Sequence, residues 1–167
     1  LKLRWKILFW SFTGKINKIQ NKLKLTFSKG SPKNIIIIFP YDEPSFRVAY
    51  YSFRNLGKKT EREIHYKFLV NEKFKKLFHM QLGEIIYTKD SNPDSMLSDE
   101  KLLLNLLKSQ CFDIIVDLNI VFHLGFARLV SLLNSEMKVG FESDFSDKFY
   151  NIQLDISKSG IIEKGFK

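Results

Sequence analysis

Residues 34–46 read Asn-Ile-Ile-Ile-Ile-Phe-Pro-Tyr-Asp-Glu-Pro-Ser-Phe, and this stretch decides the fold. The continuous apolar run from Ile35 to Phe39 is typical of a strand covered on both faces, as in a parallel sheet between two layers of helices. Asp42 can cap the helix that follows, with Pro44 in its first turn, where proline is favoured. The stretch therefore predicts a strand, a short loop and a helix in immediate succession.

The same alternation continues along the chain. Strand-like runs follow at 64–70, 84–88, 112–118, 137–141 and, at an edge, 150–156, and helical stripes lie at 46–53, 74–78, 102–107 and 124–133. Strands that alternate with helices form a parallel sheet with helices on both faces. We therefore predict a Rossmann-like, doubly wound α/β domain with five or six mostly parallel strands over residues 34–167. Such sheets bind ligands beyond the C-terminal ends of their strands, here the loops at 40–45, 71–72, 89–98, 119–123 and 142–149.

Residues 1–33 form a separate, basic arm and linker. Residues 1–41 contain nine Lys and Arg and no acidic residue, whereas the remaining 126 residues balance 18 basic against 18 acidic side chains. Seven apolar side chains fall on one helical stripe: Trp5, Leu8, Phe9, Phe12, Ile16, Ile19 and Leu23. This pattern predicts an amphipathic helix over residues 5–25 whose stripe docks weakly or projects. A helix rich in Lys, Trp and Phe suits the interface of an anionic membrane.

Composition and motifs exclude several classes of protein. Because the excess positive charge belongs to the arm, the domain has no expected basic patch, and nucleic acid is not an expected partner. The single cysteine, Cys111, is predicted to be buried and excludes a disulfide framework. The chain has no Gly-x-Gly-x-x-Gly motif, no phosphate-binding Gly-Lys-Ser/Thr loop and no nucleophile elbow. The histidines lack metal-type spacing, so we expect neither a metal nor a cofactor.

The candidate functional residues follow the first and fourth predicted strands. Asp42 lies where a carboxylate would face the ligand side of the sheet, and we select it as the candidate catalytic residue. Ser45, Arg47, Asn119 and His123 are the candidates for substrate binding. Each also has a purely structural interpretation. Asp42 can cap its helix, Arg47 can pair with Glu43 one turn away, and His123 can lie at the surface or cap a helix.

Two resemblances bear on function. The run Asp113-Ile-Ile-Val-Asp117 resembles the phosphoacceptor strand of bacterial receiver domains, but two strand–helix units separate it from the first strand where receivers have one. Three other features occur in order. They are the first strand with its acidic loop, residues 35–42, the run Phe-Asp-Ile-Ile-Val-Asp-Leu at 112–118, and Lys-Val-Gly-Phe at 138–141 followed by Asp-Lys-Phe-Tyr-Asn at 147–151. Together they resemble the N-terminal domain of the heptosyltransferases, family nine of the glycosyltransferases with two Rossmann-like domains.

The resemblance implies that the chain is half of an enzyme. The N-terminal domain of this family supplies the acceptor side and the general base, a role that the resemblance assigns to Asp42. A C-terminal domain, absent from this sequence, holds the nucleotide-sugar donor. The implied acceptor is a lipid-linked saccharide, as in the synthesis of lipopolysaccharide or another cell-envelope glycan, and residues 1–29 would meet the anionic membrane. We expect a cytoplasmic protein that can attach to the inner face of the cytoplasmic membrane, and no turnover by this half alone. The alternative is a non-catalytic Rossmann-like binding module.

Overall fold

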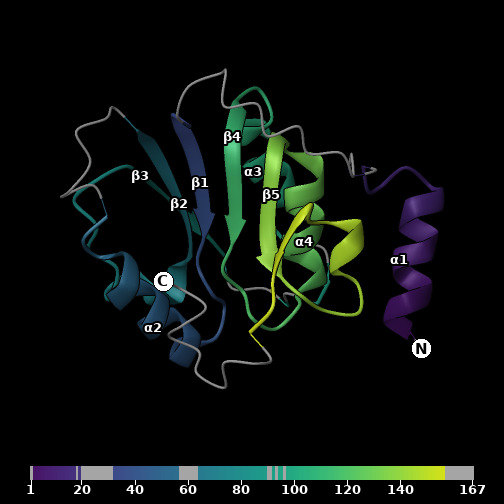
Figure 1. Ribbon diagram of the computed structural model, residues 1–167, viewed down its shortest axis with the longest axis horizontal. Helices are drawn as coiled ribbons and strands as arrows, with labels where there is room; N and C mark the ends of the chain where they lie inside the picture. Colours follow the sequence, from purple (N-terminus) through teal and green to yellow (C-terminus); the bar gives the residue numbers. More distant parts are fainter. Residues whose placement is uncertain are drawn as a thin grey trace.

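The computed structural model describes residues 2–17, 19, 32–56, 64–89, 92, 94–95 and 97–156. Helices and strands alternate through most of this part of the chain (Figure 1). The elements are α1 (Lys2–Phe12), β1 (Asn34–Ile38), α2 (Glu43–Phe53), β2 (His65–Asn71), η2 (Glu72–Phe74), β3 (Glu84–Thr88), α3 (Glu100–Leu107), β4 (Cys111–Asp117), α4 (Leu124–Leu132), β5 (Asn134–Phe141), η3 (Ser146–Lys148) and β6 (Ile152–Leu154).

The six strands form one parallel sheet in the order β3-β2-β1-β4-β5-β6, which confirms the predicted Rossmann-like fold. β1 lies at the centre, where Ile38 is the register partner of Leu69 in β2 and of Asp117 in β4. Ile36 and Ile38 are fully buried, as the unbroken apolar run predicted. Strand β6, with three residues, closes one edge of the sheet.

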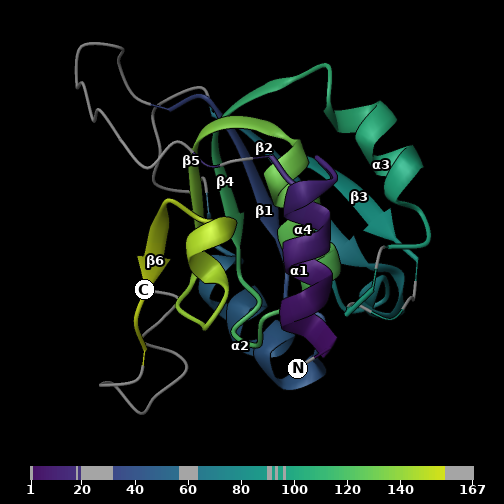
Figure 2. The same ribbon diagram turned by 90° about the vertical axis from the view of Figure 1, so that its right-hand side faces the viewer.

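Helices and apolar connections cover both faces of the sheet (Figures 1 and 2). On one face Phe46 and Ala49 of α2 pack with Phe74 and Phe78, which lie in the connection from β2 to β3. On the other face the apolar sides of α3 and α4 meet the sheet, and their buried residues include Leu103, Leu107, Leu124, Ala127, Leu129 and Val130. The chain therefore winds over one face from β1 to β3 and over the opposite face from β3 to β5.

Three local predictions differ from the structure. The expected helix around Phe74 is a single 3-10 turn, because the segment is too short for a stable α-helix. The rings of Phe74 and Phe78 are nevertheless buried in the core. Cys111 is exposed rather than buried, because it is the first residue of β4 and stands at the rim of the sheet. Strand β5 begins at Asn134, three residues before the expected Met137.

The arm differs most from its prediction. Helix α1 ends at Phe12, since Gly14 adopts a φ of +69° and Lys15 N–H donates to the Trp10 carbonyl at 2.9 Å. This is the Schellman arrangement that ends helices at a glycine. The predicted helix therefore does not continue through residues 13–17, and its remaining part, 20–25, lies outside the described residues.

Most of the predicted stripe of α1 projects from the domain, which is one of the two expected outcomes, and Ile16 is the member that departs from it. Ile7 and Trp10 are buried in the core cluster that also contains the apolar residues of α4, together with Ile16 beyond the turn, while Trp5 and Phe12 point to solvent. Ile16 is separated from the expected stripe because the turn at Gly14 redirects the chain. Figure 2 shows α1 lying over α4 as an additional layer. Among the described residues, none of the helices has the length and apolarity needed to cross a bilayer.

Candidate functional site

The candidate site lies where the chain changes from one face of the sheet to the other. β1 and β4 are neighbours, yet α2 follows β1 onto one face and α4 follows β4 onto the opposite face. The two loops must diverge at the C-terminal edge, which is where doubly wound sheets bind their ligands. Two hydrogen bonds join the loops: Leu118 N–H donates to the Ile38 carbonyl at 2.9 Å, and Tyr41 N–H donates to Asn119 Oδ1 at 2.8 Å.

A buried polar network holds these loops from beneath. Asp117 Oδ1 accepts from the backbone N–H and the side-chain amide of Asn119, at 3.0 and 2.7 Å, and Oδ2 accepts from the Tyr150 hydroxyl at 2.6 Å. Burial raises the pKa of Asp117, and the hydrogen bonds from Tyr150 and Asn119 partly oppose that shift. The pKa of Tyr150 also lies above its ordinary value, because its hydroxyl is buried against the Asp117 carboxylate. One carboxylate thereby links Tyr150 to the loop of Asn119, and Asn119 in turn holds the backbone of Tyr41.

Gly140 makes room for this network. The ring of Tyr150 lies so close to β5 that a Cβ on residue 140 would stand 2.7 Å from the ring carbon Cδ1. Only glycine therefore allows the ring to reach across β5 to Asp117. Asn151, next in the chain, accepts from Lys138 N–H at 2.7 Å and donates to the Glu136 carbonyl at 2.7 Å. The motif residues noted in the sequence at 112–118, 138–141 and 147–151 thus meet in one place.

Asp42 is the N-cap of α2 and lies next to this junction. Its Oδ1 accepts from Ser45 N–H at 2.9 Å, and its backbone is extended, with φ −83° and ψ 146°. The carboxylate is half-buried, and Oδ2 makes no hydrogen bond with the described residues. The capping role foreseen in the sequence is therefore present, and one oxygen remains for another donor.

Two of the proposed substrate-binding residues already have structural roles. Arg47 donates from Nε and Nη2 to Glu43 Oε1, at 2.8 and 2.6 Å, on the exposed side of α2. Ser45 is buried within the first turn of the helix. Of the two interpretations that the sequence left open for Arg47, the structure favours its pairing with Glu43.

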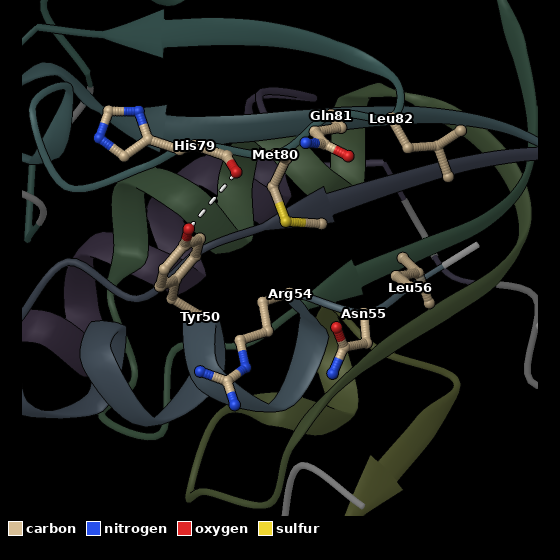
Figure 3. Close-up of a pocket in the computed structure, with 8 residues that line it drawn as sticks. All are labelled: Tyr50, Arg54, Asn55, Leu56, His79, Met80, Gln81 and Leu82. Carbon is tan, nitrogen blue, oxygen red and sulfur yellow. Dashed lines mark hydrogen bonds between the residues drawn. The ribbon is translucent and has the colours of Figure 1, made fainter. Parts of the chain in front are cut away.

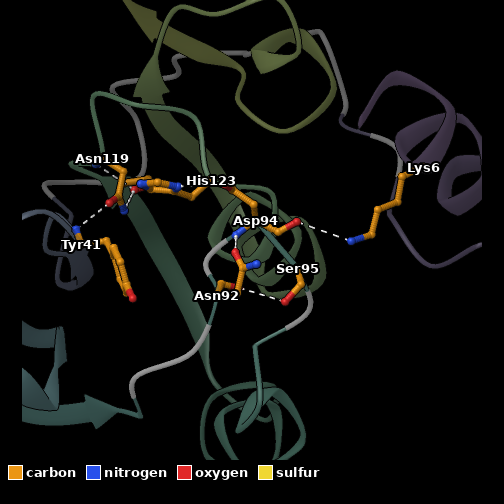
Figure 4. Close-up of polar contacts among 8 residues, drawn as sticks. Lys6, Tyr41, Asn92, Asp94, Ser95, Asn119 and His123 are labelled. Carbon is orange, nitrogen blue, oxygen red and sulfur yellow. Dashed lines mark hydrogen bonds and ion pairs between the residues drawn. The ribbon is translucent and has the colours of Figure 1, made fainter. Parts of the chain in front are cut away.

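His123 and Tyr41 meet at the sheet edge. Their rings pack edge to face with centroids 5.7 Å apart, and His123 Nδ1 lies 3.1 Å from Asp94 Oδ1 in the loop before α3 (Figure 4). Lys73, which follows β2, places its Nζ 3.7 Å from the centre of the Tyr41 ring. The structure therefore gathers Asn119, His123 and Lys73 around Tyr41, whereas Arg47 extends outward along α2.

Four residues at the site were not singled out from the sequence: Tyr41, Lys73, Asp94 and Tyr150. Asp94 and Lys73 fall within or beside the loops that the strand order marked, but nothing in the local sequence distinguishes them from other surface charges. Tyr41 was visible only as the neighbour of Asp42. Among the described residues no group of three or more His, Cys, Asp or Glu side chains is arranged to hold a metal ion.

A hollow of about 530 Å³ lies elsewhere, between the end of α2 and the segment before β3 (Figure 3). Its lining includes Tyr50, Arg54, His79 and Gln81, and the Tyr50 hydroxyl donates to the His79 carbonyl at 3.4 Å. Asp42 lies at the opposite end of α2. The hollow is therefore separate from the residues that the sequence singled out.

Comparison with known proteins establishes the fold. No protein-family model matches the chain, and no curated protein sequence matches it. Two solved structures of the E. coli heptosyltransferase WaaC, one with ADP-2-deoxy-2-fluoro heptose and one with ADP, each superpose with a TM-score of 0.59 at 16% identity. The match covers 80% of this chain but 45% of WaaC, so the chain spans less than half of the protein that it resembles. The likeness to one Rossmann-like half of a heptosyltransferase is confirmed for the fold.

Proposed function

We propose that this chain is the acceptor-side half of a glycosyltransferase with two Rossmann-like domains. The observation that carries the proposal is the superposition of most of the chain on one half of a heptosyltransferase with an ADP-sugar. The position of Asp42 supports it, because this carboxylate stands at the switch point of the sheet with one oxygen available. A second half, beyond this sequence, would hold the nucleotide-sugar donor.

The proposed reaction transfers a sugar to a hydroxyl group. The acceptor oxygen attacks the anomeric carbon of the donor, the bond from that carbon to the diphosphate oxygen breaks, and the nucleoside diphosphate leaves. Asp42 accepts the proton of the attacking hydroxyl through Oδ2, which requires the two oxygens to lie within hydrogen-bond distance. The Ser45 N–H holds Oδ1 and so orients the carboxylate.

The other residues at the sheet edge would position the base or bind the acceptor. Asn119 positions the loop of Asp42 through Tyr41 N–H, and His123 offers a ring edge beside Tyr41. Lys73 is exposed at the same edge and adds a positive charge for an anionic acceptor. The other two candidates for substrate binding, Ser45 and Arg47, would contact the acceptor from the first turns of α2. No cofactor or metal takes part in this scheme.

The acceptor is a lipid-linked saccharide, and the protein works at the inner face of the cytoplasmic membrane. This part of the proposal rests on the charge of residues 1–29 and on the apolar side chains that α1 leaves exposed. Anionic lipids attract basic segments by about 1 kcal/mol per Lys or Arg near the surface. Peripheral attachment would keep the protein at the bilayer that holds its acceptor.

The test is turnover by the full-length protein with Asp42 replaced by Asn. Asparagine caps a helix as well as aspartate, so the free energy of unfolding stays nearly unchanged. It cannot accept the hydroxyl proton, so the rate of ADP release from an ADP-heptose donor with lipid-linked acceptor falls by roughly 10²–10⁴-fold. Glu43→Gln is the matched control, because it removes the adjacent carboxylate and should leave turnover unchanged. Full activity in Asp42→Asn would contradict the catalytic role.

A non-catalytic binding module is the second candidate. The observations that favour it are the capping bond of Asp42 and the Arg47–Glu43 pair, since both side chains then have structural roles without a reaction. Such a module would bind saccharide equally well with Asp42→Asn and would release no nucleotide. The two candidates therefore differ in turnover and agree in fold.

A further inference from the structure

Helix α1 has two apolar faces, and the domain covers only one of them. The inner face buries Ile7 and Trp10 against the core cluster. The outer face is formed by Trp5, Leu8, Phe9 and Phe12, which are spaced as one helical stripe and are 68, 47, 59 and 93% exposed. Single exposed apolar residues are ordinary, but four contiguous ones on one helix form a patch that calls for a partner.

The inner contacts set the direction in which the outer face points. Arg128 donates from Nη1 to the Lys15 carbonyl at 2.7 Å, and its guanidinium lies 4.8 Å from the centre of the Trp10 ring. The same Arg128 is paired with Glu100 at 2.7 Å, with both side chains buried. Lys6 Nζ reaches the Asp94 carbonyl at 3.4 Å (Figure 4). The helix cannot roll to bury Trp5 without breaking these contacts.

The charge around the outer face selects the partner. Lys2, Arg4 and Lys15 are exposed on or beside α1, and Lys15 Nζ lies 5.8 Å from the centre of the Phe9 ring. Residues 1–41 contain no carboxylate side chain to oppose them. A second copy of this chain would bring two basic rims together, which is unfavourable for a symmetric interface. An apolar, aromatic face inside a basic rim instead matches an anionic lipid surface.

We propose that the outer face of α1 is a pre-oriented lipid-contact surface for an anionic phospholipid bilayer. Trp5, Leu8, Phe9 and Phe12 enter the boundary between headgroups and acyl chains, while Lys2, Arg4 and Lys15 contact lipid phosphates. Trp10 stays in the protein. This surface rests on the peripheral location proposed above, and it differs from a free amphipathic arm because only one tryptophan of α1 reaches the lipid.

The two tryptophans of the chain, Trp5 and Trp10, make the proposal directly measurable. Fluorescence is recorded with vesicles of phosphatidylglycerol and phosphatidylcholine that carry brominated acyl chains. We expect the bromine atoms to quench the wild-type protein. Trp5→Phe, in which Trp10 is the sole tryptophan, should still bind these vesicles and show almost no quenching. Equal quenching of both proteins would overturn the proposal, because α1 would then insert as a whole.

Vesicle flotation with two sets of variants completes the test. The triple variant Trp5→Ser/Phe9→Ser/Phe12→Ser loses apolar area that would be buried in lipid, so its partition coefficient should fall at least about tenfold. The double variant Lys2→Glu/Arg4→Glu should bind more weakly to anionic vesicles only. Tyr51→Ser/Leu77→Ser removes exposed apolar side chains from the opposite layer and should bind as the wild type does. Unaltered binding by the triple variant, equal binding to neutral vesicles, or self-association that competes with lipid would each overturn the proposal. Lipid binding is measured without turnover, so a failure here leaves the transfer proposal intact.

Discussion

Tyr150 donates a hydrogen bond to Asp117 across 2.6 Å, and both side chains are buried between β4 and the segment that follows β5. The two residues are 33 positions apart in the chain. Through Asn119 the same carboxylate is linked to the backbone of Tyr41, beside the candidate base. The geometry at the C-terminal edge of the sheet therefore depends on a contact that lies beneath it.

Replacing Tyr150 with Phe removes one donor from the buried Asp117. The loss should lower the free energy of unfolding by about 1–3 kcal/mol, because a buried carboxylate oxygen is left without a partner. Burial already raises the pKa of Asp117, and the variant should raise it further. The destabilisation is then largest at pH values above that pKa and shrinks as the pH falls and the carboxyl is protonated. Urea unfolding at about pH 4 and about pH 8 measures both effects. Tyr51→Phe, at an exposed position, is the control and should change neither value.

Gly140→Ala should displace the ring of Tyr150. The new Cβ would stand 2.7 Å from ring carbon Cδ1, which is too close for any side chain to accept without movement. We expect a loss of about 1–3 kcal/mol from overpacking. Because the displaced hydroxyl no longer reaches Asp117, Tyr150→Phe should cost less in this variant than in the wild type, as a double-mutant cycle will show. Additive effects of the two changes would contradict this account.

Lys138 should make the free energy of unfolding depend on pH in the alkaline range. Its side chain is buried with Nζ 3.1 Å from the Ser131 carbonyl, and burial lowers the pKa from 10.5 to about 8. Between these values the unfolded chain binds more protons than the folded one, so stability rises with pH from about 8 to about 10.5. Lys138→Met should lack this rise, measured as the difference in unfolding free energy between the two pH values. Lys108→Met is the matched control, because that lysine is exposed and should keep the wild-type slope.

Arg128→Met should weaken the attachment of α1 and leave the buried charge of Glu100 without a partner. Glu100 would lose its partner, and removal of one member of a buried pair costs about 3–5 kcal/mol. Adding Glu100→Gln should recover much of that stability, because no uncompensated charge remains. Both variants lack the contacts to Lys15 and Trp10, so amide hydrogen exchange in α1 should be faster in each. Unchanged exchange would show that the apolar inner face alone fixes the helix.

The sequence by itself determined the architecture of the sheet. The apolar run at 35–39 and the largely apolar run at 112–118 predicted covered strands, and their alternation with helical stripes predicted a parallel sheet. Asp42 as the cap of α2 and Arg47 as the partner of Glu43 were also foreseeable, because both interactions span fewer than five residues. Local spacing is enough wherever an interaction closes within one helical turn.

Only the tertiary structure decided which parts of those elements meet. Helix α1 carries apolar residues all round, so periodicity could not show that Ile7 and Trp10 face the domain while Trp5 and Phe12 face solvent. The junction of Asp117, Asn119 and Tyr150 joins loops from different strands, and no local pattern encodes a contact across 33 residues. Such contacts depend on how the sheet twists and packs. A hydrogen bond or an apolar contact contributes most to stability when it is buried, and burial exists only once the chain has folded around it.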